Sequence, residues 1–380
     1  MSITKPLTAI LTVLLISVFG FGMIAAADES SELDELKDSI NTKLTEGTSS
    51  EAQEIIGDFE LDVGDPDSIN EITVKGVMEK IISLFFGNIS SPIRVLGKLL
   101  AVSVLCTLAG SLAAERLEIS GVYRIIGSLA AILSVYDCLQ DCISVTASCL
   151  NELTVFMLSY IPVYAGITSA AGHIVQGTSF YGTNLFLCEA VAFIVKSVLS
   201  PLLSILIAFS VVGAVNPDIK LGKAAGTVKR AITWGLGILM TVFTGVLSIH
   251  NAVGAASDSA RTKAIRFAAS SFIPIIGGSV SETYSALRGS LGIIKAGTGS
   301  IGVILIAAIV LKPIIVLISA RAVLAIGGLM CEILGQNEIA AFVSNISSII
   351  AIALSIVICV SIMFIISTCI VMMTATGTGA

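Results

Sequence analysis

The sequence predicts an all-α protein that crosses a membrane several times. Of its 380 residues, 55% are hydrophobic and only 13% are charged, against about 25% in ordinary soluble domains. The mean hydropathy is +0.98. A soluble protein of this length still needs polar side chains over its surface. The expected solvent for most of the chain is therefore lipid, in which helices satisfy their own backbone hydrogen bonds.

Charge divides the chain into two regions. Residues 28–91 hold 16 Asp and Glu against 4 Lys, a net charge of −12, whereas the chain from residue 92 onward holds 11 acids against 16 Lys and Arg, a net of +5. Nucleic-acid binding is not expected, because the acidic region repels phosphate and the cations are scattered through apolar sequence. Residues 28–91 are predicted to be an acidic, solvated segment.

The amino terminus has the plan of a secretory signal. Lys5 precedes an apolar run over residues 7–24, and Ala25, Ala26 and Ala27 precede two acids, as at an A-x-A cleavage site. We predict a signal peptide over residues 1–27. An uncleaved anchor is the alternative, because the run is just long enough to span a bilayer. In both cases the acidic segment is exported.

An amphipathic helix is predicted near the end of the acidic segment. Over residues 74–86, Val77, Ile81, Leu84 and Phe85 share one face, with charges on another. Such a helix lies on a membrane surface or against a partner. A solvated spacer is the alternative.

Five or six crossings are predicted from the apolar runs. The candidates are residues 93–114, 122–142, 183–215, 231–253, 300–330 and 340–373. The chain is thus divided into a first transmembrane helix (92–120), a membrane unit (121–217), a basic loop (218–230), a second membrane unit (231–330) and a final transmembrane helix (331–380). The third, fifth and sixth runs exceed 30 residues, so each is tilted, extends past the membrane or is broken.

Lysine and arginine placement predicts the orientation. No Lys or Arg lies between Arg124 and Lys196, whereas residues 218–230 contain Lys220, Lys223, Lys229 and Arg230. The first stretch is expected outside and the second in the cytoplasm. Residues 258–295 carry five cations, yet counting places them outside. A re-entrant segment or a miscounted crossing would remove this conflict.

The two membrane units look like an internal repeat. Residues 159–166 (SYIPVYAG) match residues 271–278 (SFIPIIGG) at an offset of 112, and the same offset places residues 199–202 on 311–314. Two matches at one offset indicate two related helical units. Proline and glycine interrupt helices, so we expect breaks at Pro162 with Gly166 and at Pro274 with Gly277 and Gly278.

Broken helices and intramembrane charges suggest a transport path. Paired breaks in two halves point to a conduction site, although loops that cap amphipathic helices are the alternative. Charges in apolar runs usually face the bundle or water, although snorkelling explains some of them. The candidates are Glu189, Lys196, Lys312 and Arg321, together with Pro201 and Pro313 inside the long runs.

No pattern predicts chemistry. The chain has only His173 and His250, and its eight cysteines include no CxxC pair, so neither a metal nor any other cofactor is expected. No phosphate loop, HExxH motif or nucleophile elbow is present. The glycines indicate close helix packing in lipid. We therefore predict that the protein is not an enzyme.

The segment over residues 263–283 (KAIRFAASSFIPIIGGSVSET), with residues 160–162 (YIP) and 215–217 (VNP), resembles the stage III sporulation protein AE family of endospore-forming bacteria. The resemblance implies a multi-pass protein of the mother-cell membrane around the forespore. It also implies partners, namely the other membrane and intermembrane-space components of a secretion-like channel assembly and its cytoplasmic ATPase. Within this channel, or feeding tube, the chain would be a permease-like conduit or, alternatively, a scaffold that seats other components.

Overall fold

The computed structural model describes residue 53 and residues 74–113, 120–216, 219, 221–272 and 277–376. These residues form helices α4 (Val74–Asn88), α5 (Ser90–Ala113), α6 (Ser120–Ala170), α7 (Ile174–Ile194), the π-helix η2 (Val195–Leu199), α8 (Ser200–Val215), α9 (Gly222–Phe272), α10 (Gly277–Ile333) and α11 (Asn337–Thr376). The predicted signal peptide, most of the acidic segment and Pro274 lie outside the described residues. The helix predicted over residues 74–86 is confirmed as α4.

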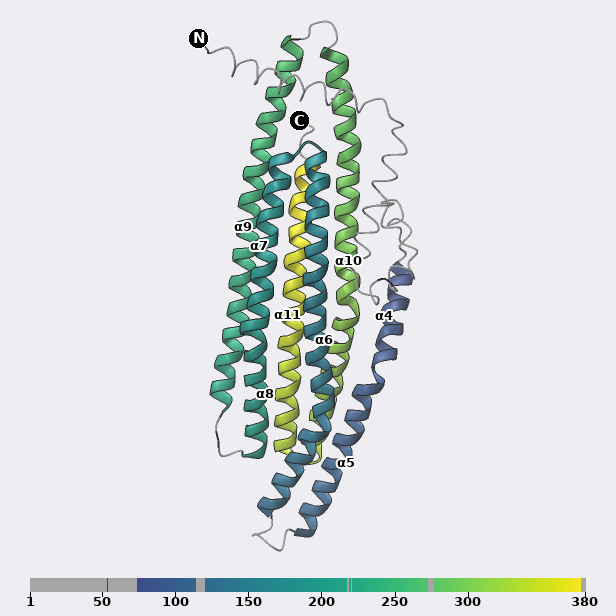
Figure 1. Ribbon diagram of the computed structural model, residues 1–380. Helices are drawn as coiled ribbons and strands as arrows, with labels where there is room; N and C mark the ends of the chain where they lie inside the picture. The colour runs from purple at the N-terminus through teal and green to yellow at the C-terminus, as the bar shows by residue number, and fades with distance from the viewer. Residues whose placement is uncertain are drawn as a thin grey trace.

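The helices form one elongated bundle around α11 (Figure 1). Helix α11 packs against α6, α8, α9 and α10, while α4 and α5 lie at the edge against α10. From α5 onward the direction alternates along the chain, with α7, η2 and α8 counted as one continuous segment (Figure 1). The α6–α7 turn and the facing ends of α9 and α10 therefore lie at one end of the bundle, drawn at the top of Figure 1, and the α10–α11 turn lies at the other.

Six helical segments are long and apolar enough to span a membrane, in agreement with the six predicted runs. They are Pro92–Ser111, Ile125–Ala170, Ile174–Val215, Gly222–Arg261, Gly297–Ile333 and Asn337–Ile370. The last five have 34 to 46 residues, which at 1.5 Å per residue is ~51–69 Å. A tilt of 40° in a 30 Å hydrocarbon layer accommodates only ~39 Å. These helices therefore extend past the hydrocarbon on at least one side.

The break predicted at Pro162 and Gly166 is wrong. Helix α6 continues through Pro162 to Ala170, and both residues lie on its exposed side. A proline can be accommodated in a membrane helix because neighbouring groups satisfy the freed carbonyl. The stretch between the predicted runs 122–142 and 183–215 is therefore mostly helical, and only the short α6–α7 turn connects the two helices.

The helical chain actually turns at two other glycines. Gly172 (φ 85°) follows α6 and Gly335 (φ 76°) follows α10. At the first turn the amide of His173 donates to the carbonyl of Thr168 at 3.1 Å, and at the second that of Gln336 donates to Cys331 at 2.9 Å. These six-to-one bonds define Schellman caps, which need a left-handed residue that glycine adopts without steric cost.

Pro201 changes the helix in which it lies without ending it. The residues just before it form the π-helix η2, in which the amide of Ser200 donates to the carbonyl of Val195. Proline has no amide hydrogen to donate to residue 197 and crowds that carbonyl, so a wider turn relieves the conflict. Pro313, by contrast, lies buried inside α10, which continues to Ile333.

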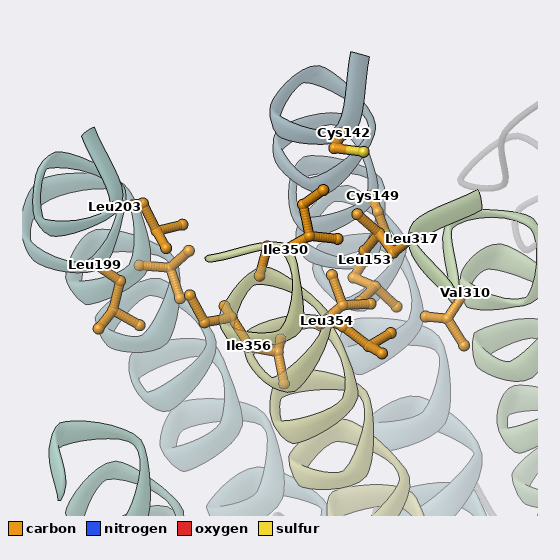
Figure 2. Close-up of a cluster of buried hydrophobic side chains, with 14 of the residues drawn as sticks. Cys142, Cys149, Leu153, Leu199, Leu203, Val310, Leu317, Ile350, Leu354 and Ile356 are labelled. Carbon is orange, nitrogen blue, oxygen red and sulfur yellow. The ribbon is translucent and has the colours of Figure 1, made fainter. Parts of the chain in front are cut away.

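The middle of the bundle has an apolar core around α11. Side chains of α6, α8 and α10 point towards Ile350, Leu354 and Ile356 of α11 (Figure 2), and Leu317 and Val357 are fully buried. Lipid tails are as apolar as these side chains, so close packing holds the core together in a membrane more than exclusion of water does.

Candidate functional site

The residues singled out from the sequence do not meet in one place. Glu189, Lys196, Pro201 and Arg321 are exposed, Lys312 is half-buried and Pro313 is buried. Gly277 and Gly278 are the first two residues of α10. Glu189 and Lys196, the second residue of η2, form no ion pair with each other within the described chain. Three of the four charges singled out from the sequence, Glu189, Lys196 and Arg321, are thus exposed on the bundle.

Polar side chains instead gather inside the bundle near the α6–α7 turn. Asp258 of α9 is 1% exposed. Its carboxylate accepts hydrogen bonds from the amides of Val175, at 3.0 Å, and Gln176, at 2.8 Å. These amides belong to the first turn of α7, where backbone donors have no partner within the helix. Because the side chain of His173 provides no cap, the cap of α7 comes from another helix.

The same cluster links α7, α9 and α11. The Gln176 side-chain amide donates to Asn251 Oδ1 at 2.8 Å, and Asn251 Nδ2 donates to the carbonyl of Ile370 at 3.0 Å. Further along α7, Ser367 donates to Asn184. Gln176 and Asn184 are each 1% exposed. A run of buried side-chain hydrogen bonds therefore fixes the positions of three helices relative to one another.

Aromatic rings and glycines continue the cluster towards α10. Tyr160 stacks on Tyr164 with ring centroids 5.3 Å apart, and its hydroxyl donates to the carbonyl of Thr298 at 3.4 Å. A Cβ at Gly302 would lie 2.6 Å from the Tyr160 ring, so glycine is what permits this approach. Lys295, one helical turn before Gly299, is fully buried. Among the residues whose side chains are described, Lys295 and Asp258 are the buried Lys, Arg, Asp or Glu residues.

This geometry is suited to holding helices in place. Where side chains are described, the structure contains no group of three His, Cys, Asp or Glu that could hold a metal. The Asp258 carboxylate accepts hydrogen bonds from two backbone amides of α7. These bonds position α7 and use both carboxylate oxygens. The buried groups therefore act on the arrangement of helices, and the structure assigns them no catalytic chemistry.

Sequence reasoning missed Asp258, Gln176 and Asn251 because their partners lie 75 to 119 residues away in sequence. A signal was nevertheless present. The charged stretch over residues 258–295 conflicted with the expected topology, and two of its charges prove to be buried. Helix α9 runs to Phe272 and α10 starts at Gly277, and both the re-entrant segment and the miscounted crossing stay predictions.

The two copies of the repeated motif lie in different surroundings. Residues 159–166 are inside α6, whereas residues 271–278 fall where α9 ends and α10 begins. Each predicted unit nevertheless contains two antiparallel helical segments. In the first unit α6 runs towards the α6–α7 end and α7–α8 runs away from it (Figure 1). In the second unit α9 runs towards that end and α10 runs away from it. The internal repeat itself stays a prediction.

A cavity of about 440 Å³ lies lower in the bundle, between α6, η2 with α8, and α11. Lys196 and Ser200, next to Pro201, are among its lining residues. Of the predicted site residues, Lys196 is thus the one that borders this cavity. Single-turn π-helices often mark functional positions in helices, and here the π-helix forms part of the cavity wall.

Comparison with known proteins gives the same family that the segments over residues 160–162, 215–217 and 263–283 resemble. The family model described as Stage III sporulation protein AE matches residues 67–375. The protein named Stage III sporulation protein AE from Bacillus subtilis (strain 168) is 21% identical over 292 residues, which covers 76% of this chain and 73% of that protein. No solved structure matches the chain. Because this match covers most of the chain and includes the six apolar spans, the chain belongs to the stage III sporulation protein AE family.

Proposed function

We propose that this chain is a membrane scaffold of the channel assembly that joins the mother cell to the forespore during endospore formation. It would reside in the mother-cell membrane and seat the other membrane, intermembrane-space and ATPase components. Family membership supports the link to sporulation, and the six apolar spans support a multi-pass location. The choice of scaffold over conduit depends on where the charges lie.

The observation that carries the proposal is the exposure of Glu189 and Arg321. Both lie within apolar spans, on the outer surface of the bundle, without a side-chain partner in the described chain. A charge facing lipid is costly, so such residues normally face protein or water. Neighbouring subunits that cover these positions would remove the cost, and opposite charges on those subunits would add specificity.

A conduit through the single chain has less support. Much of the space around α11 is filled by Leu and Ile side chains (Figure 2), and the cavity beside it has a mostly aliphatic wall. Of the four charges expected to line a path, Glu189, Lys196 and Arg321 are exposed and Lys312 is half-buried, and of these four only Lys196 lines that cavity. Because ion or solute passage needs polar groups or water along the path, transport within the assembly is assigned to a space between subunits.

The experiment replaces Glu189→Gln and Arg321→Gln separately in the full-length chain in sporulating cells. We expect each variant to reach the membrane at normal levels and to keep its protease resistance, because neither side chain has a partner within the bundle. Co-purification of the other assembly components should fall several-fold, and spore yield should fall with it. Gly166→Ala, also on an exposed helix surface, is the matched control and should leave both unchanged.

Two results would contradict the scaffold. Normal co-purification and spore yield in both charge variants would show that these positions are not covered by subunits. Full assembly combined with loss of forespore support would instead favour the conduit, because the charges would then serve passage and not contact.

A further inference from the structure

The cavity beside η2 has the shape of a groove along the bundle. Its wall runs from Leu139 to Thr154 on α6, from Val191 to Leu203 through η2, and from Ile349 to Val360 on α11. The residues of α6 alone cover ~22 Å at 1.5 Å per residue. Most of the wall is aliphatic, with Leu150, Leu203 and Ile356 among its members.

The shape of the groove favours a long, thin apolar occupant. Its volume is about 440 Å³, and its aliphatic wall extends along several turns of α6 and α11. An extended hydrocarbon chain is ~4–5 Å wide, the contact diameter of its methylene groups, and fits this shape.

The groove also carries one positive charge, which indicates that a molecule bound there has a negatively charged group attached to its hydrocarbon chain. Lys196 is the single charged residue of the lining, and Asn151, Ser197 and Ser200 add polar side chains to the same wall. Four of the five residues of η2 (Val195, Lys196, Ser197 and Leu199) border the cavity, so the π-turn brings the cation and the aliphatic wall together. The ammonium group of Lys196 is exposed and has no ion-pair partner in the described parts of the chain. A cation within an apolar span needs an anion or water nearby.

We propose that this groove binds an anionic phospholipid, with one acyl chain along the aliphatic wall and the headgroup phosphate against Lys196. The site is separate from Glu189 and Arg321, so its success or failure is independent of the proposed scaffold function. Bound lipid would fill a space that the helices themselves leave open beside α11.

The test uses the purified full-length chain in detergent, stripped of lipid and titrated with dioctanoyl phosphatidylglycerol or dioctanoyl phosphatidylcholine under native mass spectrometry. We expect the wild type to bind the anionic lipid about tenfold more tightly, as one hydrogen bond to a charged group would give. Lys196→Gln should abolish this preference. Lys312→Gln, which removes a lysine outside the lining, should retain it.

A second variant tests the acyl chain. Ala147 lines the groove from the exposed side of α6, so Ala147→Leu should narrow the groove without disturbing the core and should weaken both lipids several-fold. Equal binding of the two lipids by the wild type, or an unchanged preference in Lys196→Gln, would overturn the proposal. Unchanged binding in Ala147→Leu would also overturn it. A photo-crosslinker at Ala147 that captures protein and no lipid in native membranes would assign the groove to a partner segment instead.

Discussion

The end of the bundle near the α6–α7 turn and the middle of the bundle around α11 are held together by different interactions. At the turn, Asp258, Gln176 and Asn251 make hydrogen bonds with defined partners and directions. In the middle, aliphatic side chains such as Ile350 and Leu354 pack without direction (Figure 2). In lipid, apolar packing alone discriminates weakly between helix registers. The hydrogen bonds near the α6–α7 turn therefore specify how the helices are arranged, and the apolar side chains around α11 fill the space between them.

The largest effect is expected from removing the cap of α7. Asp258→Ala leaves two backbone donors of α7 without an acceptor, and hydrogen bonds to charged groups contribute about 1.5–3 kcal/mol each. We expect a loss of about 3 kcal/mol in the free energy of unfolding, measured by denaturant titration of the protein in mild detergent. Ser257→Ala is the matched control, because that exposed hydroxyl bonds only within its own helix. Equal stability of the two variants would refute the assigned cap.

A close approach between α6 and α10 gives the next effect. In Gly302→Ala the new methyl group would lie 2.6 Å from the buried Tyr160 ring, and overpacking of this kind costs about 1–3 kcal/mol. The melting temperature in detergent should fall by several degrees. An unchanged melting temperature would mean that α6 and α10 are further apart at this position than the 2.6 Å approach indicates.

A smaller effect is expected at the link between α9 and α11. Asn251→Ala removes the acceptor of Gln176 and the donor to Ile370. Hydrogen bonds between membrane helices contribute about 0.6 kcal/mol on average and up to about 1.7, so we expect a loss of about 1 kcal/mol. Hydrogen exchange should accelerate locally, at the amides of α11 near Ile370. Uniform acceleration along α11 would mean that Asn251 supports the whole helix.

The smallest effect is expected from Gly166→Ala. No atom lies within 4 Å of a Cβ placed there, and alanine favours a helix by up to about 1 kcal/mol over glycine. The melting temperature should stay the same or rise slightly, in contrast to Gly302→Ala. A marked fall would restore the predicted helix break at Pro162 and Gly166.

The sequence predicted the membrane spans well and the interior poorly, for a physical reason. Apolar runs are local, so all six were found, together with the helix at residues 74–86. The turns were misplaced because Pro162 was weighted above Gly172, although only the latter has positive φ. The π-helix before Pro201 was anticipated only as a general break. The cap by Asp258 joins residues 83 positions apart, and hydropathy contains no information on such pairs.

The cap also has a consequence for how the chain is made. Ribosomes deliver α6 and α7 to the membrane before Asp258 of α9, and the carbonyl of Ile370 that holds Asn251 follows 119 residues after Asn251. Until Asp258 arrives, the first turn of α7 retains unsatisfied backbone donors, which are costly in a bilayer. A truncated chain that stops before α9 therefore presents an open polar hairpin end. Only a chain that includes α9 can close it, which gives membrane proteases and insertases a physical basis for distinguishing such fragments from longer chains.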